Sequence, residues 1–387
     1  MKKLLSLALA LLMLAVMLPV VSMADEITWE GSNNVYWQAG NKSAQTATLA
    51  EALKAAYMAN NGDITITCRP DSDVGEMTHG HVADNITIIG NGAYISGGEC
   101  DLEVDTYMFS RDTGSQVESG GAYLDKDITI TASNLYNLGV WGERHTNHTV
   151  NINLTNCDGK DPVNLQRVYI SGTAGVNNIT VTGCDFLTKA TALYSNADGT
   201  VVIDNCTFKG GQVPVNFNHK ADGKQTVTVK NSTFTNCGDE GEWSAFAAPV
   251  RFVNSGKGSL NATIENNTFT NTVGTNGDIL LGDYREGKES HDVTASITPA
   301  STGDTTVKNS LGDPKPVTEK VTAKTDGSIT PVKEEGPTTI VIISPTQETP
   351  KTDDQKNPAT GANDLVAVAV AAAALALAGS AIILRKD

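Results

Sequence analysis

The central part of the chain repeats one short pattern of apolar and polar positions. Aliphatic residues alternate with polar ones, a small residue follows, and a phenylalanine often comes two positions later. Because side chains alternate across a strand, this period of two indicates short strands that bury one face. The clear copies are residues 150–157, 179–186, 201–208, 227–234 and 262–269, and looser copies are 86–91 and 128–133.

The spacing of the small positions predicts a solenoid. Strands this short, repeated at steps of 22 to 35 residues, are typical of solenoid rungs joined by loops of variable length. A β-sandwich also has many short strands, but it would not keep the same side-chain types in register. The steps are too long for hexapeptide or nonapeptide β-rolls. The small positions are Cys157, Cys184, Cys206, Ser232 and Asn267.

A helix is expected before the first rung, because Thr48 and Glu51 have the spacing of a capping box. This helix and the repeated rungs resemble the right-handed parallel β-helix, or pectin-lyase-like, superfamily over roughly residues 48–298. The resemblance implies an all-β fold, a right-handed parallel β-helix solenoid with an N-terminal capping helix. A solenoid needs such a cap because its first rung exposes apolar core and unpaired strand edges.

The chain has six cysteines, a number that would normally suggest disulfides in an exported protein. Three of them fall at the small position of successive rungs. Stacked side chains lie about 4.8 Å apart, whereas a disulfide needs Cβ atoms about 3.8 Å apart. We therefore expect a column of buried thiols, Cys157, Cys184 and Cys206, continued by Ser232 and Asn267.

A second strand precedes each repeated unit, and its inward positions align as Val140, Val168, Leu193, Val215, Phe217 and Phe252. Period two then sends outward Trp141, Glu143, Tyr169, Tyr194, Asn216, Asn218 and Arg251, flanked by Arg144 and Arg167. Aromatic rings beside amides and guanidinium groups suit sugar rings, so these nine residues form the candidate glycan-binding surface, and the two flanking arginines could serve an acidic glycan. The alternative is ordinary exposed strand residues, since Tyr and Trp favour strands.

The resemblance also raises the possibility of a polysaccharide lyase or glycosidase. The domain lacks the Asn-Thr-Asp, Asp-Asp, Gly-His-Gly and Arg-Ile-Lys segments of polygalacturonase-like enzymes. Glu143 is a candidate acid or base, assisted by Arg144 or His145, but a glycosidase needs two carboxylates and no partner is evident. His79 and His81 could bind a metal with Glu76; exposed loop histidines are the more common reading, so neither a metal nor a cofactor is predicted.

The two ends of the chain carry targeting signals. Residues 1–24 have the basic start, apolar run and small-residue cleavage site of a signal peptide. At the other end an apolar run, 365–384, is long enough to cross a bilayer, and Arg385 and Lys386 follow it. This arrangement, with the preceding segment, resembles the LPxTG-type sorting signal of Gram-positive surface proteins. The segment reads Asn357, Pro358, Ala359, Thr360 and Gly361, with Asn357 where leucine is usual.

That resemblance implies cleavage by sortase between Thr360 and Gly361 and attachment of Thr360 to a peptidoglycan precursor. The net charge of −16 argues against nucleic acid and anionic lipid as partners. Seven of the 13 prolines lie between Pro314 and Pro358, which predicts an extended, wall-spanning linker.

The predicted organisation is a signal peptide (1–24), a β-helix domain (25–303), a linker (304–356) and a sorting signal (357–387) whose transmembrane helix (365–384) contacts the membrane only before sorting. The preferred hypothesis is a surface protein covalently anchored to the cell wall, with the β-helix as an adhesion module for a polysaccharide or a host or neighbour-cell glycan. The alternatives are a polysaccharide lyase or glycoside hydrolase on the same fold, and a structural spacer.

Overall fold

The structure is a computed structural model, and its described residues all belong to one compact unit. These are residues 27–59, 62–77, 79–82, 85–97, 101–104, 107–109, 116–118, 126–142, 148–159, 168–239, 244–284, 292–301 and 304–332. The predicted signal peptide and sorting signal lie outside them. Within the described residues, no helix is long and apolar enough to span a membrane.

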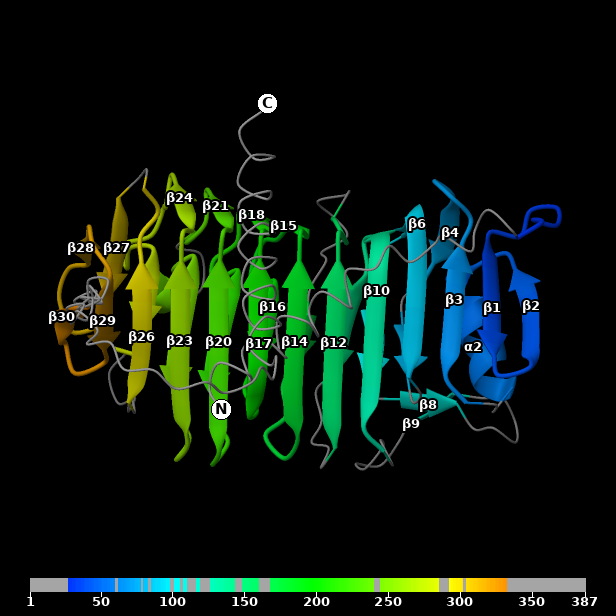
Figure 1. Ribbon diagram of the computed structural model, residues 1–387, viewed down its shortest axis with the longest axis horizontal. Coiled ribbons are helices and arrows are strands. Elements are labelled where there is room, and N and C mark those ends of the chain that lie inside the picture. Colours follow the sequence, from blue (N-terminus) through cyan, green and yellow to red (C-terminus); the bar gives the residue numbers. More distant parts are fainter. Residues whose placement is uncertain are drawn as a thin grey trace, which may run out of the picture. The chain divides into compact units, whose positions relative to one another are not determined.

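The described chain has an all-β, solenoid-like fold built on long parallel sheets. The long sheet holds 14 strands, and Figure 1 shows them side by side. Each clear copy of the sequence repeat supplies one of its strands. The strands are β1 (Val35–Ala39), β2 (Lys42–Thr46), β3 (Ile64–Cys68), β4 (Asp73–Glu76), β6 (Ile86–Ser96), β10 (Ile128–Tyr136), β12 (Thr149–Thr155), β14 (Val176–Thr182), β17 (Gly199–Asp204), β20 (Lys224–Lys230), β23 (Ser259–Glu265), β26 (Val293–Thr298), β29 (Val321–Lys324) and β30 (Ile329–Pro331).

A second sheet has ten strands and takes one strand from each rung. Its strands alternate along the chain with those of the long sheet, so a rung passes through both. They are β5 (His79–Val82), β7 (Asp101–Val104), β11 (Gly139–Gly142), β13 (Val168–Ile170), β16 (Leu193–Ser195), β19 (Val215–His219), β22 (Val250–Asn254), β25 (Ile279–Leu281), β27 (Thr305–Lys308) and β28 (Lys315–Val317).

A short four-stranded sheet follows the small position of the repeat and explains its phenylalanine. Its members are β15 (Asp185–Leu187), β18 (Thr207–Lys209), β21 (Thr233–Thr235) and β24 (Thr268–Thr270). The central residues are Phe186, Phe208, Phe234 and Phe269, whose successive ring centroids lie 5.0, 4.7 and 5.0 Å apart. Stacked rings at this distance add to the free energy gained by burying them. A separate antiparallel pair joins β8 (Tyr107–Phe109) and β9 (Gln116–Glu118).

The core of the unit consists of columns of aliphatic side chains in register. One column on the long sheet runs through Ile130, Ile152, Ile179, Val201 and Val227, which are all fully buried. Each copy of the sequence pattern therefore faces the same side of the ladder. This confirms the predicted rungs.

The turn that ends each long strand depends on one residue with a left-handed backbone. Asparagine at this position has φ near 50°, as in Asn156, Asn205, Asn231 and Asn266, and Gly183 takes φ 64° in the remaining rung. Asparagine and glycine adopt this conformation more readily than other residues. The left-handed residue stands directly before the small position of the repeat, so the turn aims that side chain inward.

The predicted thiol column is present in the structure. Cys157, Cys184 and Cys206 are buried free thiols, and side-chain hydrogen bonds with the other two, together with burial, raise the pKa of the Cys184 thiol. The column continues as predicted, because the Cys206 N–H donates to Ser232 Oγ over 3.1 Å and the Ser232 N–H donates to Asn267 Oδ1 over 2.9 Å.

Helix α2 (Leu49–Ala59) closes the N-terminal end together with the β1–β2 hairpin. The predicted capping box forms: the Glu51 N–H donates to Thr48 Oγ1, and the Thr48 N–H donates to Glu51 Oε2, each over 3.2 Å. The helix buries Leu49, Ala52 and Leu53 against the first rungs. The hairpin, in which β1 also pairs antiparallel with β3, had no signal in the repeat.

The C-terminal end also changes from parallel to antiparallel pairing. β28 pairs antiparallel with β27, β29 with β26, and β30 with β29. Antiparallel additions cover strand edges that a further rung would otherwise occupy. Ordered strands therefore continue to Pro331, beyond residue 303, where the sequence pattern placed the start of the linker. These strands do not carry the repeated pattern, so the sequence repeat could not predict them.

Candidate functional site

The outer face of the ten-stranded sheet carries the candidate surface. β11, β13, β16, β19 and β22 pair in parallel with Val140, Val168, Leu193, Val215 and Val250 opposite one another. These side chains are fully buried, so the next residue of each strand points away from the core. The predicted alignment is confirmed, and the outward row is Trp141, Tyr169, Tyr194, Asn216 and Arg251.

The first half of the row is aromatic. The rings of Tyr169 and Tyr194 are stacked, with centroids 4.5 Å apart and planes 14° apart. Trp141 meets Tyr169 edge-on, with centroids 6.0 Å apart. Trp141 and Tyr169 are half-buried, whereas Tyr194 is only 9% exposed. The accessible ring surface of the row therefore belongs to two residues on neighbouring rungs.

The second half of the row is a buried polar cluster. The Arg251 guanidinium donates from Nη1 to Asn216 Oδ1 over 3.1 Å and from Nη2 to Asp283 Oδ2 over 3.3 Å. Phe246, in the short 3-10 helix η2 (Ser244–Phe246), places its ring 4.6 Å from the guanidinium carbon. Arg251, Asn216 and Asp283 are 4%, 7% and 7% exposed. Pairing with the carboxylate offsets the cost of burying the guanidinium.

Tyr194 lies between the aromatic half and the polar half of the row, and groups from both halves affect the pKa of its hydroxyl. Burial raises the pKa of its hydroxyl to about 12, and the neighbouring Tyr169 acts in the same direction. A hydrogen bond with Asn196 and the positive charge of Arg251 lower it to a smaller extent. The phenol is therefore neutral at physiological pH, although it lies next to the buried polar cluster.

The nine predicted residues fall into three groups, of which the structure describes two. Trp141, Tyr169 and Asn218 are partly accessible, and Asn218 Oδ1 accepts a hydrogen bond of 2.8 Å from Ser255 Oγ. Tyr194, Asn216 and Arg251 point outward as predicted but are buried, because the groups beside them on the same face cover them. Glu143, Arg144 and Arg167 lie outside the described residues, as does His145.

No family model, curated protein or solved structure matches this chain.

Phe246 and Asp283 were missed by the sequence pattern. Asp283 lies two residues after the end of β25, and Phe246 lies in a segment that the repeat does not include. Neither position recurs from rung to rung. The only signal in the sequence was Arg251 itself, a single arginine on an otherwise uncharged strand, which would need a carboxylate nearby if it were buried.

A buried histidine lies on the inner side of the same sheet. Period two places His219 inward with Val215 and Phe217, and it is fully buried. Its Nε2 lies 2.8 Å from Asp198 Oδ1, and its Nδ1 lies 3.3 Å from Asn254 Oδ1. Both ring nitrogens thus have oxygen partners, one of them on Asp198, whose side chain is 30% exposed, and this pairing supports a structural role for His219.

The predicted metal alternative falls on side chains outside the described set. His79 and His81 belong to β5, and their side chains are not among those described, whereas Glu76 ends β4 with an exposed side chain. Among the described residues, no group of three or more His, Cys, Asp or Glu side chains is arranged to hold a metal ion.

Proposed function

We propose that the chain is a surface protein that displays its solenoid as a glycan-binding module. The observation that carries this proposal is the aromatic row, in which Trp141 and Tyr169 offer partly accessible rings on adjacent rungs. Aromatic faces bind the C–H patches of sugar rings, and Asn218, two rungs from Tyr169 on the same face, adds an amide. Tyr169 is held in place by stacking on Tyr194, Trp141 packs edge-on against Tyr169, and both residues stand on strands of a rigid ladder.

Binding without turnover is the better interpretation of the described part of this face. Asp283 is the carboxylate beside the row, and its Oδ2 is engaged by the Arg251 guanidinium inside the buried cluster. An acid or base in glycoside cleavage must reach the glycosidic oxygen or a water molecule at a defined distance from a second carboxylate. A buried, paired carboxylate is poorly placed for that role.

We infer a right-handed β-helix of the pectin-lyase-like kind, because crossovers between parallel strands of one sheet are right-handed in nearly all proteins. Parallel ladders in three sheets and recurrent asparagine turns support the inference.

The location is inferred from the sequence of the two ends. The signal-peptide pattern in residues 1–24 and the segment from Asn357 to Gly361, followed by an apolar run and basic tail, support export and sortase attachment through Thr360. Residues 333–356 would then connect the display unit to the wall as an extended linker. The partners in this step are a sortase and a peptidoglycan precursor.

The test uses Gram-positive cells that express the full chain. We expect muramidase digestion to release it covalently linked to wall fragments, and we expect the cells to bind a subset of a glycan array. Tyr169→Ala should reduce that binding about tenfold, because it removes the ring face that packs against sugar C–H groups, and full burial of a large apolar side chain is worth about 1.5–3 kcal/mol.

Tyr136→Ala is the matched control, because Tyr136 is also a half-buried tyrosine but lies on the long sheet. Its cells should bind like the parent. Loss of binding in both variants would show general damage to the fold and would count against the row. New reducing or unsaturated ends in the glycan would show that the protein is an enzyme rather than a binding module. If the cells bind no glycan, a structural spacer becomes the better interpretation.

A further inference from the structure

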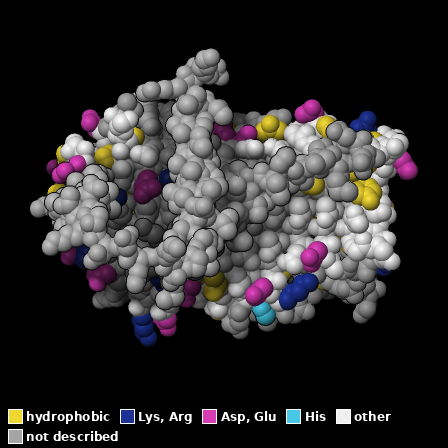
Figure 2. Space-filling model, in the orientation of Figure 1, with side chains coloured by type: hydrophobic (Ala, Val, Ile, Leu, Met, Phe, Trp, Pro, Cys, Tyr) yellow, Lys and Arg dark blue, Asp and Glu magenta, His cyan; other side chains and the backbone are white. Residues whose placement is uncertain are grey.

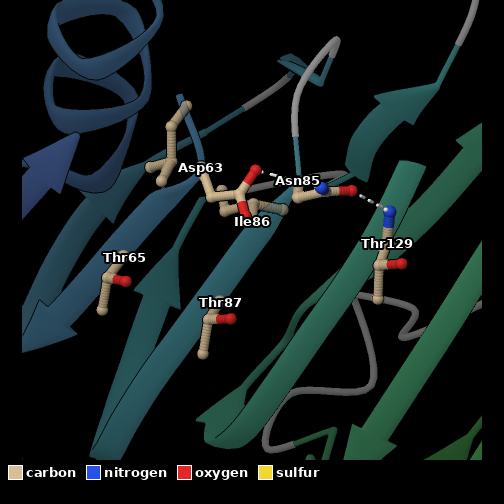
Figure 3. A pocket seen from close by; sticks show the side chains of 7 residues that line it. Asp63, Thr65, Asn85, Ile86, Thr87 and Thr129 are labelled. Atoms are coloured by element: carbon tan, nitrogen blue, oxygen red, sulfur yellow. Dashed lines mark hydrogen bonds between the residues drawn. The ribbon is translucent and has the colours of Figure 1, made fainter. Parts of the chain in front are cut away.

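A hollow on the opposite side of the rung, which we call the threonine pocket, lies where β3, β6 and β10 begin. It has a volume of about 340 Å³ and is lined by the side chains of Asp63, Thr65, Asn85, Thr87 and Thr129, with parts of the intervening isoleucines. Figure 3 shows these side chains on three neighbouring strands. Asp63 and Thr87 are exposed and the other three are half-buried, so the hollow is shallow and open to solvent.

The Asn85 amide organises this pocket. Its Nδ2 donates to Asp63 Oδ1 over 3.0 Å, and its Oδ1 accepts from the Thr129 backbone N–H over 2.8 Å. These two bonds, drawn in Figure 3, fix which way the amide faces. The second amide hydrogen of Asn85 and the second carboxylate oxygen of Asp63 make no hydrogen bond to another described residue.

Two hydroxyl groups face the same space. Thr65 and Thr87 stand opposite each other in the ladder between β3 and β6, on the outward side. Neither hydroxyl makes a hydrogen bond to another described side chain. The pocket therefore presents a carboxylate acceptor, an amide donor and two hydroxyls within one volume, on a rigid parallel ladder.

The charge of the lining narrows the ligand class. No Lys or Arg is among the lining residues, so the pocket has no partner for a phosphate or carboxylate, and Asp63 repels both. A Ca²⁺ ion needs six to eight oxygen ligands, and here one carboxylate is available. In the right-hand part of Figure 2 the described surface is largely white, the colour of uncharged polar side chains and backbone.

We propose that the threonine pocket binds one neutral sugar unit, either free or at the end of a glycan chain. Neighbouring hydroxyls of a sugar can donate to Asp63 and accept from Asn85 at the same time, while Thr65 and Thr87 bond a third. The pocket is separate from the aromatic row, because it lies on the long sheet rather than the ten-stranded sheet. Its shallow, polar lining predicts millimolar affinity.

The same column of the ladder provides an isosteric test. Thr87 is followed in register by Thr131, Asn153, Thr180, Val202 and Thr228. Valine at position 202 shows that this column accepts a β-branched side chain without a hydroxyl. Thr87→Val therefore removes a pocket hydroxyl and keeps the shape, and Thr228→Val makes the same change outside the pocket.

The experiment is a methyl NMR titration of the purified full-length protein with labelled threonine methyl groups. The probes are D-glucose, D-galactose, N-acetyl-D-glucosamine, a short glucose oligomer, and D-glucuronate, which differs from glucose by its carboxylate. We expect saturable shifts of the Thr65, Thr87 and Thr129 methyl signals with at least one neutral monosaccharide, and weaker shifts with glucuronate. A response to the oligomer alone would assign the pocket to chain ends.

Thr87→Val should weaken binding by about threefold to tenfold, the effect of one hydrogen bond, and Thr228→Val should leave it unchanged. The shifts should persist in Tyr169→Ala, which separates this proposal from the aromatic row. Absence of saturable shifts with every neutral probe, or equal affinities in wild type and Thr87→Val, would overturn the proposal.

Discussion

The two outer faces of the solenoid rest on the same kind of parallel ladder but differ in what covers them. On the ten-stranded sheet the outward row changes from rung to rung, from Trp141 and Tyr169 to Arg251, and its polar end is buried. On the long sheet the column from Thr131 to Thr228 holds only Thr, Asn and Val. A ladder therefore fixes which side chains stack, while neighbours outside the repeat decide whether the stack is exposed.

This difference has an energetic consequence. Uniform small polar side chains leave water to satisfy their groups, so each contributes little to stability. Mixed large side chains instead satisfy one another, as the Arg251 guanidinium does with Asn216 and Asp283. We expect substitutions on the outer face of the ten-stranded sheet to lower the free energy of unfolding far more than substitutions on the outer face of the long sheet.

The largest effect is expected from Arg251→Met. This change keeps much of the apolar stem but leaves the Asp283 carboxylate buried without its counter-charge. Breaking a buried ion pair from one side costs about 3–5 kcal/mol. The free energy of unfolding, measured in urea, should fall by that amount. The double variant Arg251→Met/Asp283→Asn should recover part of it, and a cost below about 1 kcal/mol for the single variant would mean that solvent screens the pair.

An intermediate effect is expected from titration of Tyr194. The pKa of its hydroxyl is about 12 in the folded protein, against 10.0 for an unperturbed tyrosine. The unfolded chain ionises first, so this contribution is fully present below pH 10 and is lost as pH rises from 10 to 12. Two pKa units correspond to at most about 2–3 kcal/mol. Unfolding measured at pH 9 and pH 11 should show a smaller loss in Tyr194→Phe than in wild type; equal losses would contradict the assignment.

The interior of the fold was accessible from the sequence because its rule is local and repeated. The aliphatic alternation predicts the rungs, Thr48 and Glu51 predict the helix cap, and the cysteine spacing predicts the thiol column. The left-handed turn also had a signal that the rung pattern did not use, namely Asn or Gly directly before the small residue, as in Asn231 and Gly183.

The rest could not be read from the repeat. Burial of Arg251 depends on Phe246, in a segment outside the repeat just before its strand, and on Asp283, which lies 32 residues later. The antiparallel strands that follow residue 303 also lie outside the repeat, as do those of the β1–β2 hairpin. Period two predicts the direction of a side chain, but its exposure is set by segments that cross the face. The aromatic row was thus correctly aligned, while its accessible part is smaller than expected.

The smallest effect is expected from Thr228→Val on the long-sheet face. Thr228 is half-buried, points away from the core, and stands beside Val202 in the same column. The change keeps the β-branched shape that suits a strand and removes one hydroxyl that water can replace. The free energy of unfolding should stay within about 0.5 kcal/mol of wild type. A loss above about 1 kcal/mol would mean that hydroxyls along this column depend on one another. The side chains of both faces would then form coupled networks, and substitutions on either face would lower the free energy of unfolding to a similar extent.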